Sequence, residues 1–275
     1  MGRAAASILD QAYRVAVEAA LEAGRILRWH FQRGLEIRHK GEIDLVTEAD
    51  LASERAVLSR IQSTFPEHAV LAEESGEAAR ASPWLWVVDP LDGTTNFAHG
   101  FHVFAVSIAL LQEGQRMLGV VYDVMRDELF TARRGEGAFL NGRPIRVSRT
   151  PRLAEALLVT GFPYDRQESP LDNTREFVTL LKHCHGVLRV GSAALDLASV
   201  AAGRLDGYWE FRLSPWDLAA GALLVEEAGG HVTTPQGDPL PSLGTDIVAT
   251  NGLIHKELLE LLASCRMAAP EGRNP

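Results

Sequence analysis

The sequence has 275 residues, of which 46% are hydrophobic, and it carries a formal net charge of −9 at pH 7. A chain of this length can bury a full core, as one large domain or as two closely packed halves. The acidic balance argues against a non-specific nucleic-acid surface, which needs a basic stripe. It also disfavours a bound anion unless cations reverse the local field, so the charge is a first, weak indication of metal ions.

Cysteine usage and hydropathy indicate the compartment. Cys184 and Cys265 form no Cys-x-x-Cys pair and no disulfide framework, which is typical of a reducing compartment. No apolar stretch is long enough to span a bilayer, and the first residues lack a charged and then apolar signal. We therefore expect a soluble, cytoplasmic protein that binds neither membrane nor nucleic acid.

The first part of the chain reads as two helices and a strand. Helical periodicity predicts one helix over 7–31 and a second over 47–65, each opening with a capping-box pattern. Residues 35–44 between them are polar and contain glycine, which is typical of a loop or hairpin. A short apolar strand over 69–72 then ends on a pair of glutamates.

The next strand leads into the most informative segment of the chain. An apolar run over 86–88 ends on Asp89 and Asp92, which are separated by Pro-Leu and followed by Gly-Thr-Thr. Carboxylates at the carboxyl end of a strand point into the mouth of an α/β sheet, where ligands usually bind. Two hard oxygen ligands so close together suit Mg²⁺ or Ca²⁺. Backbone N–H groups at a following helix start favour an anion such as phosphate. The segment therefore indicates metal-assisted phosphoryl chemistry.

The same residues also allow a purely structural interpretation, since Asp-Pro-x-Asp-Gly is typical of a tight turn. Further acids elsewhere favour the functional one. Glu73 and Glu74 end a strand, Asp217 begins a helix, and Asp50 lies in the first turn of the second helix. Singly, they are explained by a solvated loop, a helix dipole and a capping box. Together they favour one metal cleft, because every acid sits where an apolar element ends.

The remainder of the chain divides into a β-meander and an alternating segment. Strands are predicted over 103–111, 117–123, 128–132 and 137–148. From residue 151 onward strands and helices alternate, with strands over 157–160, 187–190, 206–210 and 247–250 and helices over 172–183, 193–202, 216–227 and 253–265. We therefore expect an α+β half over 1–150, with most of the metal ligands, and an α/β half over 151–275, with the last one.

Five segments, in order along the chain, resemble motifs of the inositol monophosphatase-like family of Mg²⁺-dependent, Li⁺-sensitive phosphatases, bacterial type. They are Asp44-Leu45-Val46-Thr47-x-x-Asp50, Glu73-Glu74-Ser75, residues 86–97, Gly191-Ser192-Ala193-Ala194 and Trp216-Asp217-Leu218-Ala219-Ala220-Gly221. The resemblance covers most of the chain. It implies a layered α-β-α-β-α sandwich of the sugar phosphatase type.

Carried over position by position, the resemblance implies a set of metal ligands. Glu73, Asp89 and the carbonyl oxygen of Leu91 would hold a first Mg²⁺. Asp89, Asp92 and Asp217 would hold a second, and Glu73 would also contact a weaker third ion. Two or three Mg²⁺ ions are thus the implied cofactors.

The resemblance also implies catalytic and substrate contacts. Thr94, oriented by Asp50, would position the attacking water, and the amides of Gly93 and Thr94 would face the phosphate. Lys40 would belong to a mobile flap that closes over the site. Glu210 would accept hydroxyl groups of the inositol ring. The remaining implied substrate contacts are Asp92, Gly191, Ser192 and Ala193.

The implied function is hydrolysis of myo-inositol monophosphate by a homodimeric phosphomonoesterase. Ser192 stands where threonine is common in relatives, and the missing methyl leaves strict inositol selectivity open. Within the superfamily, 3′-phosphoadenosine 5′-phosphate, fructose 1,6-bisphosphate, NADP and histidinol phosphate are alternative substrates. A non-catalytic regulatory protein with this fold is the alternative from another class, and the complete set of metal ligands argues against it.

Overall fold

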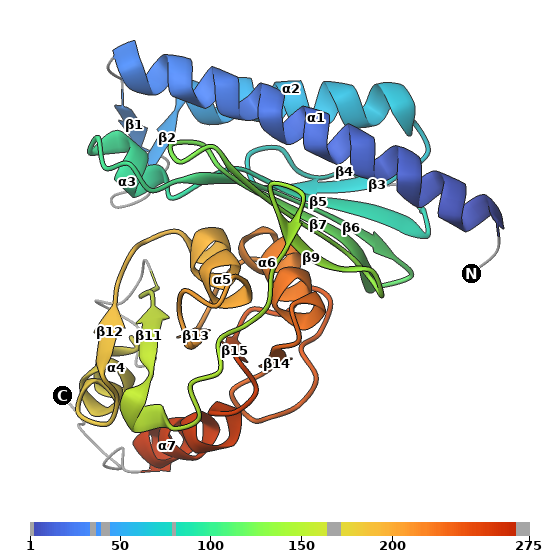
Figure 1. Cartoon of the computed structure of the whole chain (residues 1–275). Helices are drawn as coiled ribbons and strands as arrows, with labels where there is room; N and C mark the ends of the chain where they lie inside the picture. Colours follow the sequence, from blue (N-terminus) through green and yellow to red (C-terminus); the bar gives the residue numbers. More distant parts are fainter. Residues whose placement is uncertain (1–2, 34–36, 40–44, 79–80, 164–171, 268–275) are drawn as a thin grey trace.

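The computed structural model describes residues 3–33, 37–39, 45–78, 81–163 and 172–267. Its elements stack in five layers, in the order helices, sheet, helices, sheet and helices (Figure 1). This stacking confirms the predicted α-β-α-β-α sandwich. Within the described ranges, no helix is both long and apolar enough to cross a membrane.

The first layer consists of α1 (Arg3–Arg33) and α2 (Glu48–Thr64), which lie side by side on one face of the larger sheet (Figure 1). They confirm the two helices predicted at the start of the chain. Fully buried small residues on α1, among them Ala16, Ala19 and Ala23, let this helix approach its neighbours closely.

The second layer is a sheet with the strand order β10-β9-β8-β7-β6-β5-β3-β4. In that order the strands span Arg143–Pro144, Gly137–Leu140, Glu128–Arg133, Gln115–Asp123, Ala105–Gln112, Trp84–Asp92, Ala69–Ala72 and Gly76–Ala78. Neighbouring strands are antiparallel, except that β3 and β5 run parallel. The carboxyl ends of these two strands therefore meet at the same edge, where ligand sites of such sheets form.

β5 ends on the two aspartates, as the sequence predicts, and begins two residues before the apolar run. Its register against β6 shifts between Asp89 and Asp92. Pro90 lies within this irregularity, and proline has no N–H group to donate to a ladder. In a regular strand, residues three apart point to opposite faces. The irregularity removes that constraint, so both carboxylates can turn toward one site.

The third layer lies between the two sheets and consists of α5 (Ala193–Ala201) and α6 (Pro215–Glu227) (Figure 1). Every residue of α6 from 218 to 225 is buried. A helix that is apolar on all sides has to be covered on all sides, and this position between two sheets provides that cover. A Cβ atom added at Gly119 of β7 would lie 2.7 Å from the carbonyl oxygen of Ala220, so α6 rests directly on the sheet.

The fourth and fifth layers complete the sandwich. The smaller sheet has the order β12-β11-β13-β15-β14, with strands Gly186–Leu188, Leu157–Thr160, Gly207–Glu210, Ile247–Thr250 and His231–Thr233. β12, β11 and β13 are parallel, whereas β15 is antiparallel to both of its neighbours. The outer helices are α4 (Thr174–Leu181) and α7 (His255–Met267). The sequence analysis did not predict β14.

Four short elements join these layers. β1 (Ile37–His39) and β2 (Leu45–Thr47) form an antiparallel pair, and β2 leads directly into α2. α3 (Thr94–Ala98) follows the end of β5, and a 3₁₀ turn (Leu153–Glu155) precedes β11. α3 is the helix start that the Gly-Thr-Thr run predicts.

The close contact between β7 and α6 gives a testable prediction about stability. We expect Gly119→Ala to lower the free energy of unfolding by roughly 1–3 kcal/mol, because the new methyl group meets backbone atoms that cannot rotate away. Gly186→Ala is the matched control, since its Cβ would contact Leu157 Cδ1 at an ordinary 3.4 Å. Urea denaturation of the three proteins measures the difference. Equal losses in both variants would contradict the prediction.

Candidate active site

Three aspartates from both parts of the chain converge at the end of β5. One carboxylate oxygen from each of Asp89, Asp92 and Asp217 lies within 4.8 Å of the other two. Asp217 comes from the first turn of α6, where its Oδ2 accepts the N–H of Ser214 at 2.7 Å. The helix start therefore fixes its direction. The structure brings together these three predicted residues, which lie up to 128 positions apart in the sequence.

Glu73 joins this group through the parallel pairing of β3 and β5. Its backbone N–H donates to the carbonyl oxygen of Val88 at 3.2 Å, which extends the ladder by one residue beyond β3. Its carboxyl group is hydrogen-bonded to that of Asp89, and it also acts electrostatically on Asp217. We call Glu73, Asp89, Asp92 and Asp217 the acidic cluster.

Burial and mutual repulsion disfavour the ionised form of the acidic cluster. Burial, followed by the charges of Glu73, Asp92 and Asp217, raises the pKa of Asp89 well above its usual range. Burial and then the charge of Asp92 do the same to the pKa of Asp217. A cation among these oxygens would remove the repulsion and restore the charged form. Because all the donors are oxygens, the residues fit a hard divalent cation such as Mg²⁺ or Ca²⁺.

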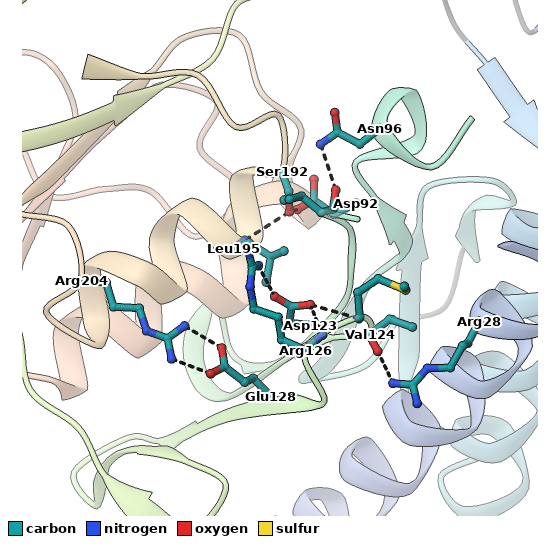
Figure 2. A network of polar contacts seen from close by, with 12 residues as sticks. Arg28, Asp92, Asn96, Asp123, Val124, Arg126, Glu128, Ser192, Leu195 and Arg204 are labelled. Atoms are coloured by element: carbon teal, nitrogen blue, oxygen red, sulfur yellow. Dashed lines mark hydrogen bonds and ion pairs between the residues drawn. The ribbon is translucent and has the colours of Figure 1, made fainter. Parts of the chain in front are cut away.

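Asp92 differs from the other members because it also binds the start of α5. It accepts a hydrogen bond from the hydroxyl of Ser192 (Figure 2). It also accepts hydrogen bonds from the N–H groups of Ala193 at 3.3 Å and Ala194 at 2.9 Å. Burial raises the pKa of Asp92 to about 6, and these hydrogen bonds oppose the rise. The Ser192 hydroxyl also accepts the N–H of Leu195 at 3.4 Å, so it caps α5.

Thr94 and Asp50, which the resemblance pairs, lie within hydrogen-bond distance of each other just after the end of β5. The Thr94 hydroxyl lies 3.0 Å from the carbonyl oxygen of Leu91 and 3.4 Å from Oδ1 of Asp50. Asp50 belongs to the first turn of α2 and is fully buried. A single hydroxyl proton is thus shared between two acceptors, and one of them is the Leu91 oxygen that the sequence analysis assigned to a metal.

Two glycines form the turns that border the site. Gly93 has a φ of 93°, and a Cβ there would lie 3.0 Å from the carbonyl oxygen of Val103, so only glycine fits this turn. Gly191 has a φ of 89° and precedes the cap of α5. The side-chain amide of Asn96 on α3 donates to the carbonyl oxygens of Val190 and Gly191 at 2.9 and 3.2 Å. It thereby fastens the two turns together (Figure 2).

Glu210 ends β13 and is almost fully buried. Its Oε2 accepts the hydroxyl proton of Tyr208 at 2.7 Å, and its carboxyl group lies against Gly161, where a Cβ atom would be only 2.2 Å away. Burial raises the pKa of Glu210 to about 7, and the charge of Asp92 contributes to this rise. The predicted ring contact is therefore electrostatically coupled to the acidic cluster.

The structure also reveals supporting residues that the sequence analysis missed. The hydroxyl of Ser53 donates to the carbonyl oxygen of Pro90 at 2.7 Å, and Oε2 of Glu54 accepts the N–H of Glu74 at 2.8 Å. Both are buried polar residues on α2, one turn after Asp50. Their spacing of three and four residues from Asp50 was a usable signal, because it places all three on one helix face. Lys40, the predicted flap residue, lies outside the described residues.

The chain is similar to known proteins over nearly its whole length. The protein family described as "Inositol monophosphatase family" matches residues 8–269. The inositol-1-monophosphatase of Synechocystis sp. is 49% identical over 252 residues, which cover 91% of this chain and 88% of that protein. The Nus factor SuhB of Pseudomonas aeruginosa is 46% identical over 89% of this chain and 93% of its own length. The structure of inositol monophosphatase from Anabaena (Nostoc) is 49% identical, with a TM-score of 0.86 over 93% of this chain and 96% of that chain.

The raised pKa values predict how stability depends on pH when divalent cations are removed. The folded state holds the protons of Asp92 and Glu210 more tightly than the unfolded state, with pKa values of about 6 and about 7. This stabilisation is complete below about pH 4 and is lost as the pH rises through 6 and 7. We expect the free energy of unfolding in EDTA to fall by roughly 3–4 kcal/mol between pH 5 and pH 8, about one pH unit from Asp92 and two from Glu210 at ~1.4 kcal/mol each.

Urea denaturation at the two pH values measures this loss. Glu210→Gln keeps an acceptor for the Tyr208 hydroxyl but cannot ionise, so its loss should be smaller than that of the wild type. A variant that loses as much stability as the wild type would show that Glu210 contributes nothing to the pH dependence.

Proposed function

Because the chain belongs to the inositol monophosphatase family and is a phosphatase, we propose that it hydrolyses myo-inositol monophosphate to inositol and phosphate with the help of Mg²⁺. The observation that carries this proposal is the convergence of the carboxylate oxygens of Asp89, Asp92 and Asp217 beside the Thr94–Asp50 pair. We further propose that the protein is inhibited by Li⁺ and acts as a cytoplasmic homodimer.

The acidic cluster would hold the ions. We assign Glu73, Asp89 and the Leu91 carbonyl oxygen to one Mg²⁺, and Asp89, Asp92 and Asp217 to a second, with Glu73 also contacting a weaker third. When bound, paired ions supply a nucleophilic water and stabilise the leaving oxygen of the ester. The convergence of buried and half-buried acids whose ionised forms repel each other supports this assignment, because a cation would neutralise that repulsion.

Thr94 and Asp50 would orient the attacking water. Asp50 is an acceptor without solvent contact, 3.4 Å from the Thr94 hydroxyl. When Thr94 donates to Asp50, its oxygen is left to accept a hydrogen bond from water, which turns a lone pair of the water toward phosphorus. The backbone amides of Gly93 and Thr94, at the start of α3, would bind the phosphate oxygens that are not displaced.

The alcohol part of the substrate would be bound by the second half of the chain. Glu210 would accept ring hydroxyl groups, while Gly191, Ser192 and Ala193 would border the ring. The fixed orientation of Glu210 supports this role, because Tyr208 occupies one of its oxygens and leaves the other for a ligand. The Ser192 hydroxyl is already engaged with Asp92, so we expect its backbone, more than its side chain, to contact the substrate.

A regulatory role beside catalysis is the second candidate function. The 46% identity with the protein named Nus factor SuhB favours it. A protein without catalytic activity is less well supported, because the acidic cluster and the Thr94–Asp50 pair are both complete in this chain.

The substrate and the metal requirement can be tested together by phosphate release. We expect myo-inositol 1-phosphate to be hydrolysed faster than fructose 1,6-bisphosphate, 3′-phosphoadenosine 5′-phosphate, NADP or histidinol phosphate. The reaction should require Mg²⁺ and should be slower when Li⁺ is added. Asp89→Asn is the inactive control, since it removes charge from both proposed ions and should lose roughly 10²–10³-fold or more. Faster phosphate release from another ester would show that the proposed substrate is wrong. Phosphate release in the presence of EDTA would refute the proposed role of the metal ions.

The proposed role of Thr94 predicts a separation between catalysis and metal binding. We expect Thr94→Ala to lower kcat roughly 10²–10⁴-fold, because the water loses its acceptor, while calorimetric titration with Mg²⁺ remains close to the wild type. Thr94→Ser keeps the hydroxyl and should retain most of the activity. Loss of Mg²⁺ binding in Thr94→Ala would show that the residue instead supports the metal site through the Leu91 loop.

A further inference from the structure

A buried acid that no step above uses lies next to the alcohol side of the site. Asp196 occupies the first turn of α5, and only 3% of it is exposed. Its backbone N–H donates to the carbonyl oxygen of Ser192 at 2.9 Å, as a helix requires. Its carboxyl group, however, forms no hydrogen bond or ion pair with any residue in the described part of the chain. Buried carboxyl groups without a partner are rare, because they lose hydration and gain nothing in return.

The surroundings of Asp196 are those of the proposed ring pocket. The charged groups that act on its carboxyl are Glu210, Asp92 and Arg189. Burial and the first two of these charges raise its pKa well above the usual range, while Arg189 opposes the rise. Asp196 lies one helical turn after Ser192, whose hydroxyl binds Asp92, and the charges of Glu210 and Asp92 act on its carboxyl group. The residue is therefore close to the predicted substrate contacts at the start of α5.

The neighbours leave Asp196 available to a ligand. Glu210 is held by the Tyr208 hydroxyl and lies against Gly161, so it does not turn to pair with Asp196. Arg189 is exposed, and its guanidinium lies over Gly191, where a Cβ atom would be 2.7 Å from Nη1. Arg189 acts on Asp196 only through its charge and forms neither a hydrogen bond nor an ion pair with it.

We propose that Asp196 is a specificity-determining residue, which binds a hydroxyl group of the alcohol part of the substrate beside Glu210. This inference rests on the proposed function and adds a residue to it. A hydroxyl group both donates and accepts, so it pairs with a carboxyl group in either protonation state. Two carboxyl groups on this side suit an uncharged polyhydric alcohol and disfavour an alcohol that carries a second phosphate.

The test compares esters that differ in their hydroxyl groups. Asp196→Ala and Asp196→Asn are assayed with myo-inositol 1-phosphate, glycerol 2-phosphate and p-nitrophenyl phosphate, whose alcohol part has no hydroxyl group. We expect Asp196→Ala to raise KM for the inositol ester and to lower the ratio of its kcat/KM to that of the aryl ester roughly 5–30-fold. Asp196→Asn keeps one acceptor oxygen and should lower the ratio less.

Asp206→Asn is the matched control. Asp206 is also a buried acid of this half, but it is engaged by the Leu157 N–H at 2.7 Å and by the Ser148 hydroxyl, away from the site. Its substitution should leave the ratio unchanged. An unchanged ratio in Asp196→Ala would overturn the proposal. If kcat/KM falls equally for all esters, the residue has a structural role, and if it does not fall for any of them, the residue does not contact the substrate. If the wild-type protein hydrolyses glycerol 2-phosphate but not the inositol ester, the proposed substrate is wrong. The role of Asp196 is then tested by the ratio of kcat/KM for glycerol 2-phosphate to that for the aryl ester.

Discussion

The contact between Asp92 and the first turn of α5 holds the candidate site together. A carboxylate at the end of β5 accepts hydrogen bonds from three donors about 100 residues away in the sequence. A buried carboxylate needs such donors, and a helix start has N–H groups that need acceptors, so each side satisfies the other. Because α5 lies between the two sheets and packs against β13 of the smaller one, this contact also joins the larger sheet to the second half of the chain.

The other parts of the site depend on the position of α5. Asn96 fastens the turn before α5 to α3, so the glycine turns of the two parts of the chain stay adjacent. α6 packs along α5 and rests on β7, and its first turn carries Asp217 toward Asp89. Because the backbones of α6 and β7 are in close contact at Gly119, α6 cannot move closer to the sheet. Packing energy thus holds acids together that would otherwise repel each other, which is the state a divalent cation would relieve.

Much of this arrangement could be predicted because its signals are local. α1 carries a long apolar periodicity, α6 is a nearly continuous apolar run, and the acids of the motifs stand where apolar elements end. Other features depend on tertiary contacts. β14 is only three residues long, and its extended conformation depends more on its pairing with β15 than on its amino-acid composition. The irregularity in β5 is visible only against β6. The division of the chain at residue 150 and the individual catalytic roles stay predictions.

Asp196 illustrates the same limit for a single residue. In the sequence, an acid in the first turn of a helix is adequately explained by the helix dipole. Only the fold places its carboxyl group under the influence of the charge of Glu210, away from solvent and without a hydrogen-bond partner among the residues that the structure describes.

The division of labour across the site follows from which layers supply its residues. The proposed reaction side comes from α2, β3, β5 and the start of α6, and its acids are oriented by backbone contacts such as those of Ser53 and Glu54. The proposed alcohol side comes from β13 and α5, with Glu210 and Asp196. Asp92 belongs to both sides, because it lies in the acidic cluster and caps α5. We therefore expect changes at Glu210 or Asp196 to alter which alcohol is accepted without displacing the proposed metal ligands, whereas a change at Asp92, or in the start of α5 that binds it, affects both sides.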